Sequence, residues 1–292
     1  MIEEKIKIKD LQISYKYFGH SEASSEFSDR DGKSSSRKSG IFLILHGWGG
    51  SSDSWIKVCE CLENNYYVYA LDFPFFGKSG DLKKIWRVDD FVSLVEEFAE
   101  NIILRHDNFY GYEKIGLIAH SFGGRVAIKI AAKNPKWIFR LFLCDAAGIK
   151  HAPTIIQKLA RVGAKMWRKV LPQKIGSLDS PKNFLRKFFA LLRTTAYKVI
   201  GASDYYKCKN DIMRETFKNI IAEDLTEYLD KIKIPTTIIW GEEDKYTPLS
   251  DGKLMDEKIQ NSKLYVIKGV GHGAHLHTPG EVCRIIKSVA DS

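Results

Sequence analysis

A serine, an aspartate and a histidine, the residue types that act together in nucleophilic catalysis, each follow an apolar run of this sequence. Ser121 lies within AHSFGG at 119–124, Asp244 ends the segment WGEED, and His272 follows a glycine near the C-terminus. A serine hydroxyl is a weak nucleophile until a base removes its proton, and a carboxylate commonly orients that base. The set therefore predicts acyl transfer. Ser121 is the expected nucleophile, His272 the base and then the acid, and Asp244 the residue that orients the histidine.

The residues around Ser121 are typical of a sharp turn between a strand and a helix. Ala119 and Gly123, two positions before and after the serine, are small, as they must be where strand and helix nearly touch. A serine that only caps the helix beginning at Phe122 is the alternative. The strand–turn–helix context and the presence of both partners favour the nucleophile.

Alternatives remain for the acid and for the base. Asp145 ends another apolar run and is the rival of Asp244 as the acid of the triad. His272, His275 and His277 also form His-x-x-His-x-His, a superficial metal-binding pattern. We expect His272 to be catalytic and the other two to pack or hydrogen-bond near the site. We expect neither a metal nor another cofactor.

Six short apolar runs alternate with helical patterns and supply the elements that position these residues. The runs lead into Gly, Asp, His or Ser and cover 41–45, 66–71, 115–119, 141–144, 236–240 and 264–267, with helical patterns such as 89–105 and 124–133 between them. Such alternation indicates a mostly parallel sheet with helices on both faces. Function in such sheets collects beyond the carboxyl ends of the strands, where the candidate residues lie.

The N-terminal part of the chain departs from this rhythm. Residues 5–18 alternate in polarity with a break at Lys9-Asp10, which predicts two strands joined by a turn. Residues from about 20 to 40 are rich in Ser, Asp, Lys and Gly without periodicity, so we expect a flexible loop.

The middle of the chain indicates a separate helical unit. Helical patterns cover 154–170, 182–200 and 211–228, and no buried strand interrupts them. We predict an all-helical cap inserted after the sixth strand. The predicted organisation is a core built from 1–148 and 229–292, with the cap at 149–228.

Four motifs in order carry a family resemblance over roughly residues 41–292. They are HGWG at 46–49, the turn at Ser121, WGEED at 240–244 and Gly271-His272. With them the chain resembles the α/β-hydrolase superfamily, in its capped branch with a serine nucleophile. The order Ser, Asp, His is that of this fold. The resemblance implies the α/β-hydrolase fold and an oxyanion hole made by the backbone N–H groups of Trp48 and Phe122.

Several residues near these motifs are candidates for the substrate pocket: His46, Gly47, Phe75, His120 and Trp167. We expect His46 to brace its loop and His120 to point away from the nucleophile. The segment DFPFFG at 72–77 resembles the family's Asp-x-Pro-Gly-x-Gly turn, but Phe75 replaces the first glycine. We expect Phe75 and Phe76 to protrude and to narrow the pocket or contact the cap.

The serine at the turn argues against those activities of this superfamily that use a different nucleophile. Haloalkane dehalogenases and epoxide hydrolases look similar but use aspartate there, and proline iminopeptidases usually carry tryptophan at the position of Phe122. We therefore predict a carboxylesterase that hydrolyses small to medium esters through an acyl-enzyme intermediate. The alternatives are a lactonase, a hydrolase of carbon–carbon bonds in vinylogous diketones, and a protein of this fold that binds a small ligand without turnover.

The net charge of +9 is concentrated in the predicted cap. Residues 149–228 hold 16 Lys and Arg against 7 Asp and Glu, and the rest of the chain is balanced. Such a surface could attract an acidic substrate or an anionic membrane, and a solvated helix face over an apolar underside is the alternative. No motif predicts nucleic-acid binding, and no feature indicates an oligomeric state.

We expect a cytoplasmic protein. The N-terminus MIEEK begins acidic and lacks the pattern of a signal peptide. No stretch approaches the roughly 18 uncharged apolar residues that a membrane span requires. The five scattered cysteines indicate free thiols in a reducing compartment.

Overall fold

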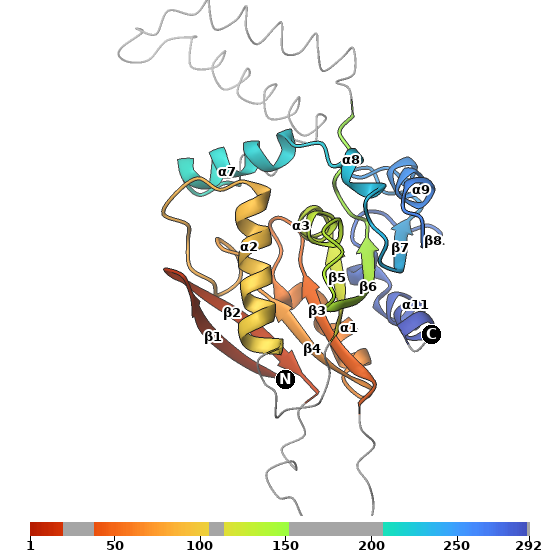
Figure 1. Cartoon of the computed structure of the whole chain (residues 1–292), viewed down its shortest axis with the longest axis horizontal. Coiled ribbons are helices and arrows are strands. Elements are labelled where there is room, and N and C mark those ends of the chain that lie inside the picture. Colours follow the sequence, from red (N-terminus) through yellow and green to blue (C-terminus); the bar gives the residue numbers. More distant parts are fainter. Residues whose placement is uncertain (20–37, 105–113, 152–206, 291–292) are drawn as a thin grey trace, which may run out of the picture. The chain divides into compact units, whose positions relative to one another are not determined.

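The computed structural model describes residues 1–19, 38–104, 114–151 and 207–290 (Figure 1). The chain divides into two compact units, the first Met1–Lys150 with Asn210–Ser292, and the second His151–Lys209. Most of the second unit, including Trp167, lies outside the described residues. The cap assigned to 149–228 therefore stays a prediction, and the part of it from Asn210 onwards groups with the sheet.

An eight-stranded sheet forms the centre of the first unit. Its order is β1-β2-β4-β3-β5-β6-β7-β8; the β1–β2 and β2–β4 pairs are antiparallel and the others are parallel. The strands are β1 (Ile2–Ile8), β2 (Leu11–Phe18), β3 (Gly40–Leu45), β4 (Tyr66–Leu71), β5 (Ile115–His120), β6 (Ile138–Cys144), β7 (Thr236–Gly241) and β8 (Ser262–Ile267). Each apolar run predicted as a strand is a strand, and the alternating N-terminal segment forms the β1–β2 hairpin.

Helices follow most of the parallel strands, as the sequence pattern predicts. They are the 3₁₀ helix η2 (Ser52–Trp55), α1 (Ile56–Leu62), α2 (Val88–Phe98) continued by the π-helix η3 (Ala99–Leu104), α3 (Phe122–Ala131), α7 (Asp211–Ala222), α8 (Thr226–Leu229), α9 (Leu249–Lys258), α10 (Ala274–His277) and α11 (Pro279–Ala290). Within the described part of the chain, none of them is long and apolar enough to cross a membrane.

The central strands are buried on both faces. Phe42 and Ile44 of β3 share one buried cluster with residues of α1 and α11. Leu43, between them, is fully buried as well, and alternation along a strand sends it to the opposite face. There α2 and α3 pack against each other in front of the sheet (Figure 1). The mostly parallel sheet with helices on both faces is therefore confirmed.

Polar contacts fasten the C-terminal end of α7 to α3, which is in turn paired with α2. Lys129 of α3 forms ion pairs of 2.6 Å with Asp89 of α2 and with Glu223, which follows α7. Arg125 of α3 donates from Nη1 to the Glu223 carbonyl oxygen at 2.9 Å. Burial lowers the pKa of Arg125 to about 10. Because cations complement the negative end of a helix, the C-terminus of α7 is fixed to the helix that follows Ser121.

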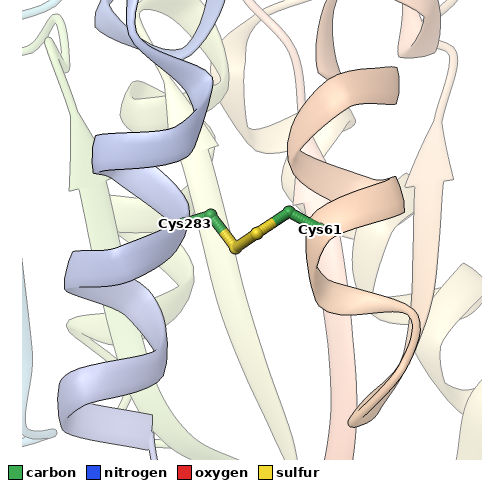
Figure 2. The surroundings of a disulfide bond; sticks show 2 residues. All are labelled: Cys61 and Cys283. Carbon is green, nitrogen blue, oxygen red and sulfur yellow. A yellow bond between two sulfur atoms is a disulfide. The ribbon is translucent and has the colours of Figure 1, made fainter.

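A disulfide joins α1 to α11 (Figure 2). Cys61 and Cys283 are 222 positions apart in the sequence, and their Cα atoms lie 6.4 Å apart. The expectation that all five cysteines are free thiols is wrong for this pair, because only the packing of two distant helices brings the sulfurs together. The inference of a reducing compartment loses the observation on which it depended.

Candidate active site

Ser121 lies at a strained turn between β5 and α3. Its φ is +48°, a value uncommon for a residue other than glycine. A Cβ at Gly123 would lie 2.5 Å from the Leu45 carbonyl oxygen, so only glycine fits where α3 passes β3. The Ser121 N–H donates to the Cys144 carbonyl at 3.3 Å, and the Ser121 carbonyl accepts from the Ala147 N–H at 3.0 Å. The main chain of the turn is therefore held on both sides.

His272 and Asp244 form a hydrogen-bonded pair. His272 Nδ1 lies 2.7 Å from Asp244 Oδ2, and the carboxylate is fully buried whereas the imidazole is 20% exposed. Burial alone would raise the pKa of Asp244, but hydrogen bonds from His272 and Thr247 outweigh it and hold that pKa below its ordinary value. An ionised carboxylate favours the tautomer with its proton on Nδ1. Nε2 of the histidine is then free to accept a proton.

Thr247 and Tyr246 border this pair, and neither is among the residues predicted from the sequence. Thr247 Oγ1 donates to Asp244 Oδ2 at 2.7 Å and lies 3.3 Å from His272 Nδ1. The N–H groups of Tyr246 and Thr247 donate to Asp244 Oδ1 at 2.8 and 3.0 Å. The Tyr246 ring, 63% exposed, lies 5.2 Å from the His272 ring. The Asp-x-x-Thr spacing at 244–247 is a signal that could have identified them, because an aspartate side chain commonly accepts hydrogen bonds from the next residues of its own turn.

Asp145, the rival acid, faces backbone N–H groups and not the histidine. It is fully buried, with φ at +45°. Oδ1 accepts from the Gly241 N–H at 2.8 Å, and Oδ2 accepts from the N–H groups of Gly273 and Ala274 at 3.0 and 2.9 Å. This geometry favours Asp244 over Asp145 as the acid of the triad.

Buried histidines lie beside His272. The His120 ring lies 4.7 Å from His272 and 4.3 Å from His275, and His275 stacks on Trp55 at 4.2 Å. The first of these contacts places His272 against the residue that precedes the predicted nucleophile. Burial lowers the pKa of His120 and lowers that of His275 to about 3. His277 is exposed. Across the described ranges, no group of three or more His, Cys, Asp or Glu is arranged to hold a metal.

The loop after β3 lies against Ser121. Its His46 contacts the Gly47 carbonyl through Nδ1 at 2.7 Å and accepts at Nε2 from the Phe73 N–H at 2.9 Å. Burial lowers the pKa of His46, in keeping with the neutral ring that these two bonds require. A Cβ at Gly47 would lie 2.6 Å from His120 Nδ1 and 3.1 Å from the Ser121 Cβ. The absence of a side chain at Gly47 therefore allows the loop to approach the serine.

Trp48 packs within a group of aromatic rings. Its ring lies 4.9 Å from Phe76, 5.5 Å from Phe122 and 5.0 Å from Phe217 of α7. In the described part of the chain, the N–H groups of Trp48 and Phe122 have no backbone hydrogen-bond partner. Phe122 is the first residue of α3, where N–H groups are unpaired and negative charge is favoured. Among the described residues, therefore, no backbone carbonyl competes for the two N–H groups predicted to form the oxyanion hole.

Phe75 and Phe76 do not protrude, contrary to the expectation from the sequence. They are 3% and 7% exposed. Phe75 has φ +77°, the conformation that the family's glycine adopts easily, and its N–H donates to the Gly80 carbonyl at 3.2 Å. The Phe76 ring lies 5.7 Å from His46. The turn keeps its backbone shape and buries both rings.

Comparisons with known proteins agree with this fold. A model of the alpha/beta hydrolase fold matches residues 40–279. Monoacylglycerol lipase ABHD6 of Mus musculus is 27% identical over 292 residues, covering 94% of this chain and 81% of the lipase. A putative esterase/lipase of Haemophilus influenzae is 23% identical, covering 85% of this chain and 82% of its own length. The crystal structure of a membrane phospholipase A, a bacterial virulence factor, has a TM-score of 0.68 at 23% identity, with coverage of 99% of this chain and 86% of its own. This chain belongs to the alpha/beta hydrolase fold family.

Proposed function

We propose that this protein is a serine hydrolase that cleaves small to medium carboxylic esters through an acyl-enzyme intermediate. The observation that carries the proposal is the 2.7 Å hydrogen bond between His272 Nδ1 and Asp244 Oδ2, in a pair whose histidine ring lies 4.7 Å from the ring of His120, the residue before Ser121. A histidine held in this way presents Nε2 as the base that a serine nucleophile needs.

In the proposed reaction, Ser121 Oγ attacks the ester carbonyl carbon while His272 takes the hydroxyl proton. The N–H groups of Trp48 and Phe122 stabilise the negative charge that develops on the carbonyl oxygen. The bond to the alcohol then breaks, and the alcohol leaves with the proton held by His272. Water, activated by the same histidine, releases the acid and restores the serine. Asp244 stabilises the imidazolium in both halves of the reaction.

The names of the relatives narrow the substrates to be tested. They include a monoacylglycerol lipase and a putative esterase/lipase, so an acyl ester of glycerol is the first natural class to try. The aromatic group around Trp48 provides apolar surface of the kind that lines pockets for acyl chains.

A substrate series tests this proposal. The purified protein is assayed with p-nitrophenyl esters of graded acyl length, monoacylglycerols, lactones and a vinylogous diketone, with Ser121→Ala as the control. We expect ester turnover, and labelling of Ser121 by a fluorophosphonate in intact-mass spectrometry. Absence of both from the wild-type protein contradicts the proposal. Cleavage of the diketone without ester turnover favours the carbon–carbon hydrolase instead.

Two expectations about the surroundings of the protein stay predictions. The basic segment 149–228 lies mostly outside the described residues, so contact with an anionic surface rests on its charge alone. A cytoplasmic location must be reconciled with the disulfide between Cys61 and Cys283.

A further inference from the structure

Asp145 holds two loops that are far apart in the sequence. Its Oδ1 accepts from the N–H of Gly241, and its Oδ2 accepts from the N–H groups of Gly273 and Ala274. Gly241 ends β7, three residues before Asp244. Gly273 directly follows His272. One carboxylate therefore connects the loop that carries the acid to the loop that carries the histidine.

The burial of Asp145 carries a cost that its hydrogen bonds must offset. The residue is 0% exposed and lies in the left-handed conformation, with φ at +45°. Burial raises its pKa, and hydrogen bonds from the Ala274 and Gly241 N–H groups oppose that shift. Burial of a carboxyl group costs free energy, and the three N–H bonds to Asp145 offset that cost. What it supplies is a precise link between two loops, because each of its bonds is directional.

We propose that Asp145 is a positioning residue that sets the spacing of Asp244 and His272 by holding the backbone of both loops. The inference rests on the proposed function, because it concerns the geometry of the same triad. Asp145 acts through the main chain: its bonds end at Gly241, Gly273 and Ala274. The Thr247 hydroxyl adds a contact of 3.2 Å to the Asp145 carbonyl, on the Asp244 side.

Asp145→Asn is the sharpest variant. Asparagine keeps the volume and accepts a positive φ readily, so the substitution removes the carboxylate and alters its hydrogen bonds without changing the shape of the side chain. Its amide oxygen can accept on one side only, and its NH₂ group then meets an N–H donor on the other. One of the two loops must therefore lose its bond.

The expected results separate positioning from general stability. For Asp145→Asn we expect kcat on a p-nitrophenyl ester to fall roughly 10- to 100-fold while KM changes less than about threefold, because misplacing a catalytic pair by a fraction of an ångström costs rate. In hydrogen–deuterium exchange, the peptide over the loop that loses its bond, either 241–247 or 271–276, should exchange at least about tenfold faster.

Asp72→Asn is the matched control for the exchange measurement. Asp72 is another buried carboxylate that accepts two backbone N–H bonds, from Ser52 at 2.7 Å and Lys78 at 3.0 Å. Neither loop that it holds carries Asp244 or His272. Its substitution should leave exchange at 241–247 and 271–276 unchanged.

Several outcomes would overturn the proposal. They are unchanged exchange in both loops of Asp145→Asn, a raised KM with unchanged kcat, and equal loosening by Asp72→Asn. If Asp145→Asn does not fold, amide exchange of the wild-type protein by NMR decides: Gly241, Gly273 and Ala274 should be protected, and free exchange of any of them rejects the link. Both exchange measurements hold even if the wild-type protein turns over no ester and binds no fluorophosphonate, so a failure of the proposed function remains distinguishable.

Discussion

The two sides of Ser121 are held by different interactions. On the acid–base side, which comprises the loops after β6, β7 and β8, hydrogen bonds converge on two buried carboxylates, Asp145 and Asp244. On the oxyanion side, which comprises the loops after β3 and β4 together with α7, aromatic rings meet around Trp48. Polar bonds fix the acid–base side, whereas on the oxyanion side aromatic packing adds to the hydrogen bonds of Asp72 and His46.

The difference matches what each side does in the proposed reaction. Proton transfer needs donor and acceptor within about 2.6–3.2 Å, a tolerance that directional hydrogen bonds can enforce. Packed rings exclude water and strengthen the interaction of N–H donors with a developing negative charge. Changes on the acid–base side should therefore reduce turnover without repacking the core, whereas changes on the oxyanion side act through shape.

Two contacts join the two sides away from Ser121. Trp55 of η2 stacks on His275 of α10, and the disulfide connects α1 with α11. The segment from η2 to α1 follows the oxyanion loop, and the segment from α10 to α11 follows His272. These contacts tie the two sides together without touching the nucleophile.

The largest expected effect is that of Asp244→Asn. Loss of the acceptor for His272 Nδ1 should lower kcat by about 10⁴-fold, because the imidazole then adopts the wrong tautomer. Steady-state kinetics beside Asp145→Asn measures the contrast between the two carboxylates. If Asp145→Asn abolishes turnover while Asp244→Asn keeps it, the roles assigned to the two aspartates are reversed.

Gly47→Ala tests the oxyanion side by shape alone. The new methyl group would lie 2.6 Å from His120 Nδ1, so the loop must move away from Ser121, and we expect kcat to fall by roughly 10²- to 10³-fold. Gly280→Ala is the matched control, because nothing lies within 4 Å of a Cβ there. Equal activity of Gly47→Ala and the wild-type protein would show that this approach is not needed for turnover.

Thr247→Val should have a smaller effect on the acid–base side. It keeps the shape of the side chain but removes the hydroxyl that donates to Asp244 Oδ2. A lost hydrogen bond to a charged group corresponds to about a tenfold fall in kcat. Thr247→Ser should restore most of the rate. No recovery in the serine variant would mean that the methyl group, and not the hydroxyl, is what matters.

The pH dependence of stability tests the role of Asp244 on the acid–base side. The pKa of Asp244 is lowered in the folded protein, so the ionised carboxylate adds stability above its ordinary pKa of 3.8. That contribution is lost as the pH falls through the folded value. Urea unfolding should show the wild-type protein more stable than Asp244→Asn at pH 7, with the gap closing below pH 3.8. A gap independent of pH would contradict this assignment.

The smallest effect on turnover is expected from breaking the link between the two sides. In the double variant Cys61→Ser and Cys283→Ser, the free energy of unfolding should be lower by about 2–5 kcal/mol, because the disulfide joins residues 222 positions apart. Its kcat at 25 °C should equal that of the wild-type protein. Thermal unfolding with and without reductant measures the loss of stability. An unchanged unfolding temperature would show that the disulfide does not contribute to stability.

The sheet and the turn at Ser121 could be predicted because their signals are local. Apolar runs separated by helical patterns indicate a parallel sheet, and Gly123 satisfies a contact that any serine turn of this kind requires. The sequence predicted Asp244 as the acid but left Asp145 as its rival, since each follows an apolar strand. Their different partners depend on how the loops after β7 and β8 fold back over the sheet.

Sequence alone determined where the strands and helices occur along the chain, because hydrophobic periodicity acts over a few residues. It also determined which residue types are available for chemistry. Tertiary structure alone decided that Asp145 holds both loops, that Phe75 and Phe76 are buried, and that Cys61 meets Cys283, and its hydrogen bonds favour the predicted Asp244 over Asp145 as the partner of His272. These contacts join positions that only the packing of the complete sheet and its helices brings together, and no local pattern encodes them.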